Sequence, residues 1–357
     1  MTEWNLGALT APISRADVKQ FRRATRASGV DWARVGSLSL VAVIAICVVG
    51  VVAALVIFSV VGTMASLFAG EASGFSAGLG FAVPVIIAAA IGVVLYFVSR
   101  IALGGGTWSR WLRLTRFAEA NGLRFAPNWA NPDYPGAIFA TGSSRSVWEH
   151  LYRTDGRYLD LGNYQYTTGS DKERQVHRWG YIAIKLDRAV PHMVLDAKSN
   201  NSLFGFSNLP ATFNRKQVLS LEGDFDRHFT LYCPNEYERD ALYVFTPDLM
   251  ALLIDESGHL DVEIIDDWMF AYSAAPLQLT DPAAMARLFR IIDTVGAKTV
   301  SRTDRYADHR VGDRTLDRVA PAGRRLRRSL PAIMIAVVAF IALVFGVNFL
   351  SLVSSLL

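Results

Sequence analysis

The sequence predicts an α+β domain with a mainly antiparallel sheet, flanked by three transmembrane helices, two N-terminal and one C-terminal. The 357 residues are 52% hydrophobic and only 19% charged, which is more apolar than an average globular chain. The excess lies in three uncharged blocks, residues 35–70, 72–99 and 329–357. Between the second and third block, strand patterns come before helix patterns, which is typical of an α+β domain rather than of a doubly wound parallel sheet.

The uncharged blocks predict membrane spans at about 37–60, 79–101 and 331–353. Each block exceeds the roughly 20 apolar residues that cross about 30 Å of hydrocarbon as a helix. A cleaved signal peptide is the alternative for the first block, but its apolar core would be short and close to the start. Here the apolar run begins only near Val35, so we expect a retained anchor.

Basic residues predict the orientation. They gather in residues 1–34 and beside the second and third spans, whereas the hairpin at 69–77 carries only Glu71. By the positive-inside rule, the N-terminus and the main domain would be cytoplasmic and the C-terminus outside, in a bacterial inner (plasma) membrane crossed several times. The expected organisation is a basic N-terminus (1–36), a transmembrane hairpin (37–103), a juxtamembrane amphipathic helix (104–122), a cytoplasmic α+β domain (123–300), an Arg-rich tether (301–330) and a transmembrane helix (331–357).

The charge distribution indicates which partners fit. The net charge is +4, but residues 117–300 contain 17 Lys and Arg against 24 Asp and Glu, so we expect no nucleic-acid partner. The basic flanks would contact the membrane through anionic lipid headgroups, or would serve only as orientation signals. The residues predicted to contact headgroups are Arg110, Arg113, Arg116, Arg324, Arg325, Arg327 and Arg328.

The juxtamembrane segment predicts a helix at 107–121, ended by Gly122. Trp108, Trp111 and Leu112 share one face, which favours a helix lying on the inner leaflet. The alternative is a helix packed on the domain with its Trp residues buried. Residues 126–136 hold three prolines and predict an irregular linker.

The domain proper reads first as strands and then as helices. A hairpin is expected to turn at Asp266-Asp267, and two helices start with a capping side chain followed by a first-turn proline, at Thr246-Pro247 and Asp281-Pro282. The predicted strands are 137–140, 146–152, 158–166, 176–186, 193–197, 218–221, 228–233, 260–264 and 268–272. Many carry aromatic residues, which would line a ligand or peptide groove or simply fill a β-rich core.

One polar constellation suggests chemistry. On an extended segment Asp224, Asp226 and His228 would point the same way, as a divalent metal or an acid/base pair requires. The alternative is a solvated turn in which Arg227 pairs with a carboxylate. No Cys-x-x-Cys or His-Glu-x-x-His spacing is present, so we expect no cofactor and no dedicated metal site.

A resemblance rests on two stretches. Residues 223–232, Gly-Asp-Phe-Asp-Arg-His-Phe-Thr-Leu-Tyr, followed by 246–250, Thr-Pro-Asp-Leu-Met, resemble a family of bacterial integral membrane proteins with a cytoplasmic domain of unknown function. The resemblance covers about 217–273. It implies two spans before a cytoplasmic α+β domain and assigns no activity, and the third span departs from it.

These observations lead to two functional hypotheses. The first is a non-enzymatic protein whose cytoplasmic domain is a protein- or ligand-binding adaptor or sensor at the inner leaflet, with an unidentified protein partner and a homo-oligomer as possible assemblies. The second is a membrane-bound metal-dependent hydrolase that uses Asp224, Asp226 and His228.

Overall fold

The computed structural model describes residues 4–27, 105–201, 207–221, 223–313 and 316–329, together with a few single positions between 50 and 92. The chain forms two compact units. One consists of residues 1–10 and 114–357, and the other of residues 11–113.

The unit of residues 11–113 contains α2 (Arg15–Ala27) and the first half of α5 (Gly105–Ala120). The ring of Trp108 lies 6.1 Å from that of Phe21 in an edge-on contact, and the guanidinium of Arg22 lies 5.7 Å above the Trp108 ring. Arg113 Nη1 donates to the carbonyl of Ala11 at 3.2 Å. Aromatic and main-chain contacts therefore join α2 to α5.

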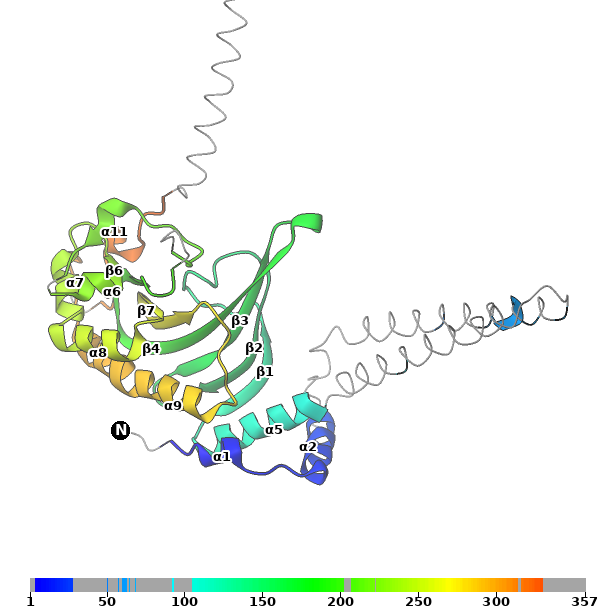
Figure 1. Ribbon diagram of the computed structural model, residues 1–357. Helices are drawn as coiled ribbons and strands as arrows, with labels where there is room; N and C mark the ends of the chain where they lie inside the picture. The colour runs from blue at the N-terminus through cyan, green and yellow to red at the C-terminus, as the bar shows by residue number, and fades with distance from the viewer. Residues whose placement is uncertain are drawn as a thin grey trace, which may run out of the picture. The chain divides into compact units, whose positions relative to one another are not determined.

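The larger unit is built on one seven-stranded sheet in which every pair of neighbours is antiparallel (Figure 1). The strand order is β1-β2-β3-β4-β6-β5, and β7 pairs with the other edge of the long, bent β4. The strands are β1 (Arg124–Ala130), β2 (Ser143–Arg153), β3 (Leu159–Thr168), β4 (Gln175–Ala197), β5 (Val218–Leu219), β6 (Phe229–Tyr232) and β7 (Asp261–Ser273).

The helices of this unit are interspersed with the strands: α6 to α8 lie between β5 and β7 in the chain, and α9 to α11 follow β7. The N-terminal cap of α9 is as expected, because the Asp281 side chain accepts the Ala283 N–H at 3.1 Å and Pro282 fills the first turn. The helices are α1 (Gly7–Thr10), the second half of α5, α6 (Phe225–His228), α7 (Glu238–Val244), α8 (Pro247–Ser257), α9 (Pro282–Ile291), a π turn (Ile292–Gly296), α10 (Ala297–Thr303) and α11 (Pro321–Arg324).

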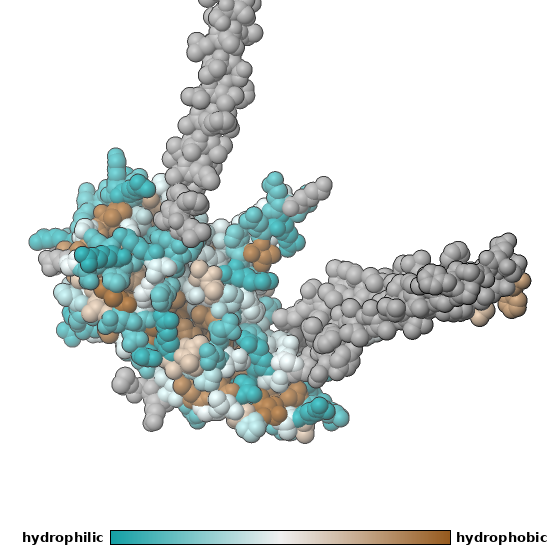
Figure 2. Space-filling view, in the orientation of Figure 1, coloured by the Kyte–Doolittle hydropathy of each residue, from teal (hydrophilic) through white to brown (hydrophobic). Residues whose placement is uncertain are grey.

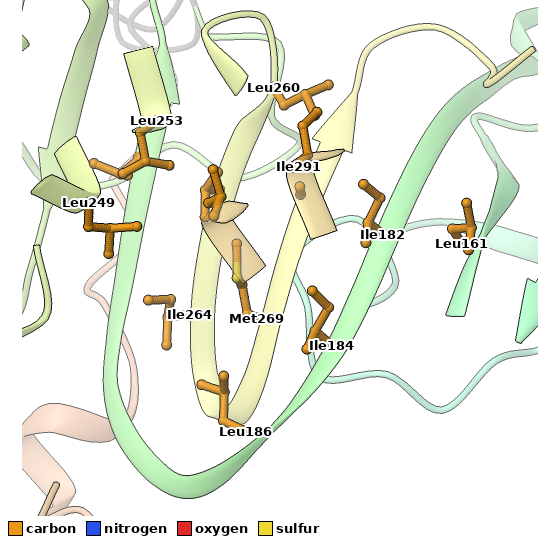
Figure 3. Packing of buried hydrophobic residues seen from close by; sticks show 14 of the residues in the cluster. Leu161, Ile182, Ile184, Leu186, Leu249, Leu253, Leu260, Ile264, Met269 and Ile291 are labelled. Atoms are coloured by element: carbon orange, nitrogen blue, oxygen red, sulfur yellow. The ribbon is translucent and has the colours of Figure 1, made fainter. Parts of the chain in front are cut away.

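One face of the sheet is apolar and lies against helices. Side chains alternate along a strand, so Ile182 and Ile184 of β4 point to this face. There they belong to the same buried cluster as Leu249 and Leu253 of α8 and Ile291 of α9 (Figure 3). We call this side the helix face.

The opposite side carries aromatic and ionisable groups, and we call it the loop face. Tyr181 and Ala183 of β4 point to it, together with Phe270 and Tyr272 of β7. Loop segments supply further members of this cluster, including Ile138, Phe139, Leu209, Ala211, Phe213 and Leu326. A core of this composition needs polar partners for its buried hydroxyl and carboxyl groups.

Three expectations about strands need correction. Residues 137–140 form turns and not a strand, and the predicted linker at 126–136 contains most of β1. The expected hairpin at Asp266-Asp267 is absent, because β7 runs through it. Asp266 takes a left-handed conformation, with φ of 54°, opposite Val190 at a register shift of β4. The two strands therefore bend together where the alternation had suggested a turn.

The predicted transmembrane helices, and with them the multi-pass inner-membrane localisation, are wrong for the part of the chain that the structure describes. Among those residues no helix is long and apolar enough to cross a bilayer. The 16 residues of α5 rise about 24 Å, short of the roughly 30 Å required. The longer run from α9 to α10 carries charged residues such as Arg290 and Lys298. The predicted spans at 37–60, 79–101 and 331–353 lie outside the described residues, apart from a few single positions.

Candidate functional site

A fully buried carboxylate, Asp160 on β3, organises one end of the loop face. Its Oδ2 accepts the hydroxyl protons of Tyr134 at 2.7 Å and Tyr181 at 2.8 Å, and its Oδ1 lies 2.9 Å from Nδ1 of His150. Burial, followed by the neighbouring Asp160 charge, raises the pKa of both tyrosines well above the usual value. The tyrosines therefore stay protonated and act as hydrogen-bond donors, which is what a buried carboxylate needs.

A second buried carboxylate, Glu263 on β7, connects the loop face to the chain near residue 326. Its Oε2 accepts from the Tyr272 hydroxyl at 2.6 Å and from the Ala137 N–H at 2.7 Å. Its Oε1 lies 2.8 Å from Nε2 of His192, and the N–H of Leu326 donates to His192 Nδ1 at 3.0 Å. Because a main-chain amide can only donate, the ring proton of a neutral His192 sits on Nε2.

A third acidic group lies at the end of β4 and β7. Asp196 and Asp261 are 5% and 0% exposed. The Ala197 N–H donates to Asp261 Oδ1 at 2.8 Å, and the Ser207 hydroxyl donates to Asp196 Oδ1 at 2.9 Å. Burial raises the pKa of both carboxyls, that of Asp261 to about 7.

An open pocket of about 730 Å³ lies where the bends of β4 and β7 meet the segment around α11. Its volume falls within the range of small-molecule sites, roughly 300 to 1,000 Å³. Its walls are strongly charged: they consist of Ala189, Asp266, Asp267, Asp317, Arg318, Val319, Arg324 and Arg325.

The acidic residues of this pocket are all paired with bases. Arg325 holds Asp266 in a two-pronged contact at 2.7 and 2.8 Å. Asp267 accepts from Lys185 at 2.7 Å, and Asp317 accepts from the Ala189 N–H at 2.8 Å with Arg188 at 3.5 Å.

Two basic residues of the pocket have no such counterpart. Arg318 and Arg324 are exposed, and no carboxylate of the described residues pairs with either. Arg324 uses only its Nε, which donates to the Val319 carbonyl at 2.9 Å. The pocket therefore offers two guanidinium groups to an anion.

The residues predicted for catalysis lie elsewhere, in and beside the short helix α6. The segment is helical rather than extended, so Asp224, Asp226 and His228 do not share one face of a strand. Asp226 accepts from the Ser220 hydroxyl and from the Leu221 N–H, while His228 Nε2 and Asp224 Oδ2 stand 4.0 Å apart at the surface. Through these two hydrogen bonds, Asp226 stabilises the turn that precedes α6.

The basic residues predicted to meet lipid divide into two groups. Of the group near residue 325, Arg325 binds Asp266, and Arg327 exchanges main-chain hydrogen bonds with the side chain of Gln217 at 3.0 Å each. Arg328 forms a bridge with Phe213. On α5, Arg110, Arg113 and Arg116 are partly buried, and Trp111 and Leu112 are buried.

The described residues contain no group of three or more His, Cys, Asp and Glu side chains placed to hold a metal ion. Cys233 is a buried free thiol, and burial raises its pKa to about 12. A thiol with such a pKa stays protonated at neutral pH and is a poor nucleophile.

Sequence reasoning missed the pocket and the buried carboxylates for different reasons. The pocket joins residues 189, 266 and 317–325, and no local spacing could reveal this. Asp160 carried a usable signal, since it lies between two leucines, Leu159 and Leu161, at the start of a predicted strand. A carboxylate in such a place must be paired if the strand is buried.

Comparisons with known proteins add little to this geometry. No family model matches the chain, and no curated protein matches it. The crystal structure of the mycobacterial trehalose monomycolate transport factor A, TtfA, is similar with a TM-score of 0.35 and 10% sequence identity, over 54% of this chain and 90% of that chain. A likeness at this level carries no argument about function.

Proposed function

We propose that the larger unit is a non-enzymatic binding module that takes a small anionic ligand, bearing a carboxylate or phosphate group, in the pocket beside α11. The observation that carries the proposal is the pair of exposed guanidinium groups, Arg318 and Arg324, in a pocket whose carboxylates are already paired. Guanidinium groups match planar carboxylate and phosphate oxygens in a two-pronged geometry.

The balance of charge at the pocket supports an anion rather than a cation. Three carboxylates face three arginines among the lining residues, and Lys185 and Arg188 add two further positive charges from behind. An anion would therefore meet a net positive potential, although residues 117–300 as a whole are acidic.

The surface favours a small ligand over a large protein partner. The exposed large hydrophobic side chains of this unit are scattered, and only Leu242 and Tyr243 of α7 are neighbours in the chain. On the face that Figure 2 draws, brown areas lie among hydrophilic ones. The exposed side chains are Val176, Val218, Leu242, Tyr243 and Leu316. Protein interfaces usually need a broader contiguous apolar patch.

The alternative of a metal-dependent hydrolase using Asp224, Asp226 and His228 stays a prediction. The bonds that Asp226 accepts from Ser220 and Leu221 supply a structural reason for this carboxylate. Loss of a hydrolytic activity on Asp224→Asn, with folding unchanged, would be needed to favour the hydrolase.

Thermal unfolding of the purified full-length chain with inorganic phosphate, pyrophosphate, citrate and succinate tests the proposal. A ligand at 100 times its Kd stabilises by about 2.7 kcal/mol, which raises Tm by roughly 5 to 10 °C for a unit of this size. We expect one class of anion to raise Tm and the double variant Arg318→Gln, Arg324→Gln to abolish the shift.

The matched control is Arg178→Gln, which removes an exposed arginine of β4 that does not line the pocket. It should keep the full response to the anion. The proposal fails if no anion changes Tm, or if Arg178→Gln weakens the response as much as the double variant does.

A further inference from the structure

The two buried carboxylates at the end of β4 and β7 face each other directly. Leu195 pairs with Val262 in the antiparallel register, so the next position places Asp196 opposite Asp261. Directly opposed side chains have Cβ atoms about 4.5 to 5.5 Å apart. The hydrogen bond from the Ala197 N–H to Asp261 Oδ1, at 2.8 Å, confirms how close the strands are here.

This arrangement is costly unless something lies between the carboxylates. Two like charges opposite each other on a sheet are destabilising, and burial adds a desolvation penalty. Asp261 is fully buried, yet its Oδ2 has no hydrogen-bond donor among the described residues. Lys198, the neighbouring base, is exposed and donates instead to the Asp226 carbonyl.

Further unsatisfied oxygens lie beside the pair. The side chains of Asn200 and Asn201 approach Asp261 and Asp196 respectively, since their amides lower the pKa of those carboxyls against the effect of burial. The Oδ1 atom of each asparagine is buried and, within the described residues, has no donor. Every unsatisfied atom of this cluster is thus an acceptor oxygen.

We propose that Asp196, Asp261, Asn200 and Asn201 form a binding site for a hard divalent cation, Ca²⁺ or Mg²⁺. Carboxylate and amide oxygens are the ligands that these ions take in proteins, with water completing the shell. The cluster contains no sulfur or imidazole ligand that would favour zinc or copper. A rotation of 180° about χ2 of an asparagine exchanges its N and O atoms. A bound ion would turn both amides, which donate to the carboxylates in its absence, so that they present oxygen, and Asn200 would give up the hydrogen bond from its Nδ2 to the His259 carbonyl at 3.3 Å.

A shared proton is the competing occupant of the carboxylate pair. It would neutralise one charge at low pH, in keeping with the raised pKa of Asp261, but it would leave the two amide oxygens unsatisfied. A cation would neutralise both carboxylates and, once the two amides have turned, would also be bound by their oxygens. The two occupants also differ in their response to an isosteric amide, because Asp261→Asn mimics the protonated acid and removes a cation ligand.

The test uses the full-length chain, stripped with a chelator and returned to CaCl2 or MgCl2 at constant ionic strength, with KCl as the ionic control. We expect Tm to rise by several degrees with one of the divalent salts and not with KCl. Tb³⁺, a luminescent substitute for Ca²⁺, should bind with one ion per chain and be excited through Tyr232 of β6, which pairs with Val194, two positions before Asp196.

Variants locate the ion. Asp261→Asn should abolish the divalent shift and the Tb³⁺ signal, and Asn201→Ala, in the partly exposed turn after β4, should weaken binding at least tenfold without unfolding the chain. Asp224→Asn, which removes an exposed carboxylate of another acidic segment, should change neither. The proposal is overturned if the wild-type chain shows no divalent shift, or if Asp261→Asn and Asn201→Ala both keep it.

Discussion

The two faces of the same sheet are both buried but are built differently. The helix face consists of aliphatic and aromatic side chains under α8 and α9, and its stability comes from apolar area removed from water. The loop face buries Asp160, Glu263, Asp196 and Asp261 among aromatic residues, and each of these must find donors or a counter-ion. The helix face therefore stabilises the fold through non-directional apolar contacts, whereas the hydrogen bonds of the loop face hold specific chain segments in place.

The largest expected effect comes from breaking the loop face at Asp160. Asp160→Ala leaves the Tyr134 and Tyr181 hydroxyls and His150 buried without their acceptor, so the free energy of unfolding should fall by about 3 to 5 kcal/mol. Urea denaturation of the wild type and the variant measures this loss of unfolding free energy. Tyr181→Phe should lower the free energy of unfolding by about 1 kcal/mol in the wild type. The loss should be much smaller in the Asp160→Ala background, because the carboxylate that accepts the Tyr181 hydroxyl is already absent.

Leu161→Ala is the matched control, since Leu161 is the next residue of β3 and points to the helix face. It should cost about 2 to 5 kcal/mol and leave the effect of Tyr181→Phe unchanged. Additivity of Tyr181→Phe with Asp160→Ala would contradict the view that the loop face works as a hydrogen-bonded network.

A smaller effect is expected at the connection between the loop face and the chain near residue 326. His192→Ala removes the acceptor of the Leu326 N–H and the donor to Glu263, which should cost about 2 kcal/mol. Hydrogen exchange should show faster exchange at the Leu326 amide. The control is His177→Ala, which removes a partly exposed ring that hydrogen-bonds to Thr168 and should leave the Leu326 amide protected. Equal loss of protection in both variants would show that His192 does not hold the chain at Leu326.

The smallest expected effect concerns pH and the Asp196–Asp261 pair. The folded-state pKa of Asp261 is about 7, above its ordinary value of 3.8, because of burial. The folded state therefore holds a proton that the unfolded state has released, and stability falls as pH rises from about 4 to about 7. In chelator, Asp261→Asn should stabilise the chain at pH 8, where the carboxylate is charged, and hardly at all at pH 4.

Equilibrium unfolding at the two pH values checks this expectation, with Asp224→Asn as the exposed control. A gain from Asp261→Asn that is the same at pH 4 and pH 8 would show that the carboxyl does not titrate as its burial implies.

The sequence predicted those features that depend on local patterns. The helix starts at Pro247 and Pro282 follow from first-turn prolines, and the strands β2, β3 and β6 follow from alternation. The expected side-chain cap forms at Asp281 but not at Thr246. The predicted hairpin at Asp266-Asp267 failed because alternation on both sides of a charged pair fits a turn as well as a bend. Only the long-range pairing with Arg325 distinguishes the two.

The candidate sites were less predictable than the fold. The sequence favoured Asp224, Asp226 and His228 because they are neighbours in the chain, whereas the structure brings together Arg318 and Asp266, which are far apart. Asp196 and Asp261 became a pair only through the register of β4 and β7. Register depends on the bends of both strands, and no local signal in the sequence encodes it.

The outer strand β1 has a consequence for self-association. Pro127 lies in the middle of this strand and has no amide hydrogen, and Glu149, the facing position of β2, takes a left-handed conformation at a register shift. A strand from a second molecule that approached this edge would find an interrupted row of donors on a locally twisted ladder. The sheet thus ends at β1 with built-in protection against edge-to-edge aggregation.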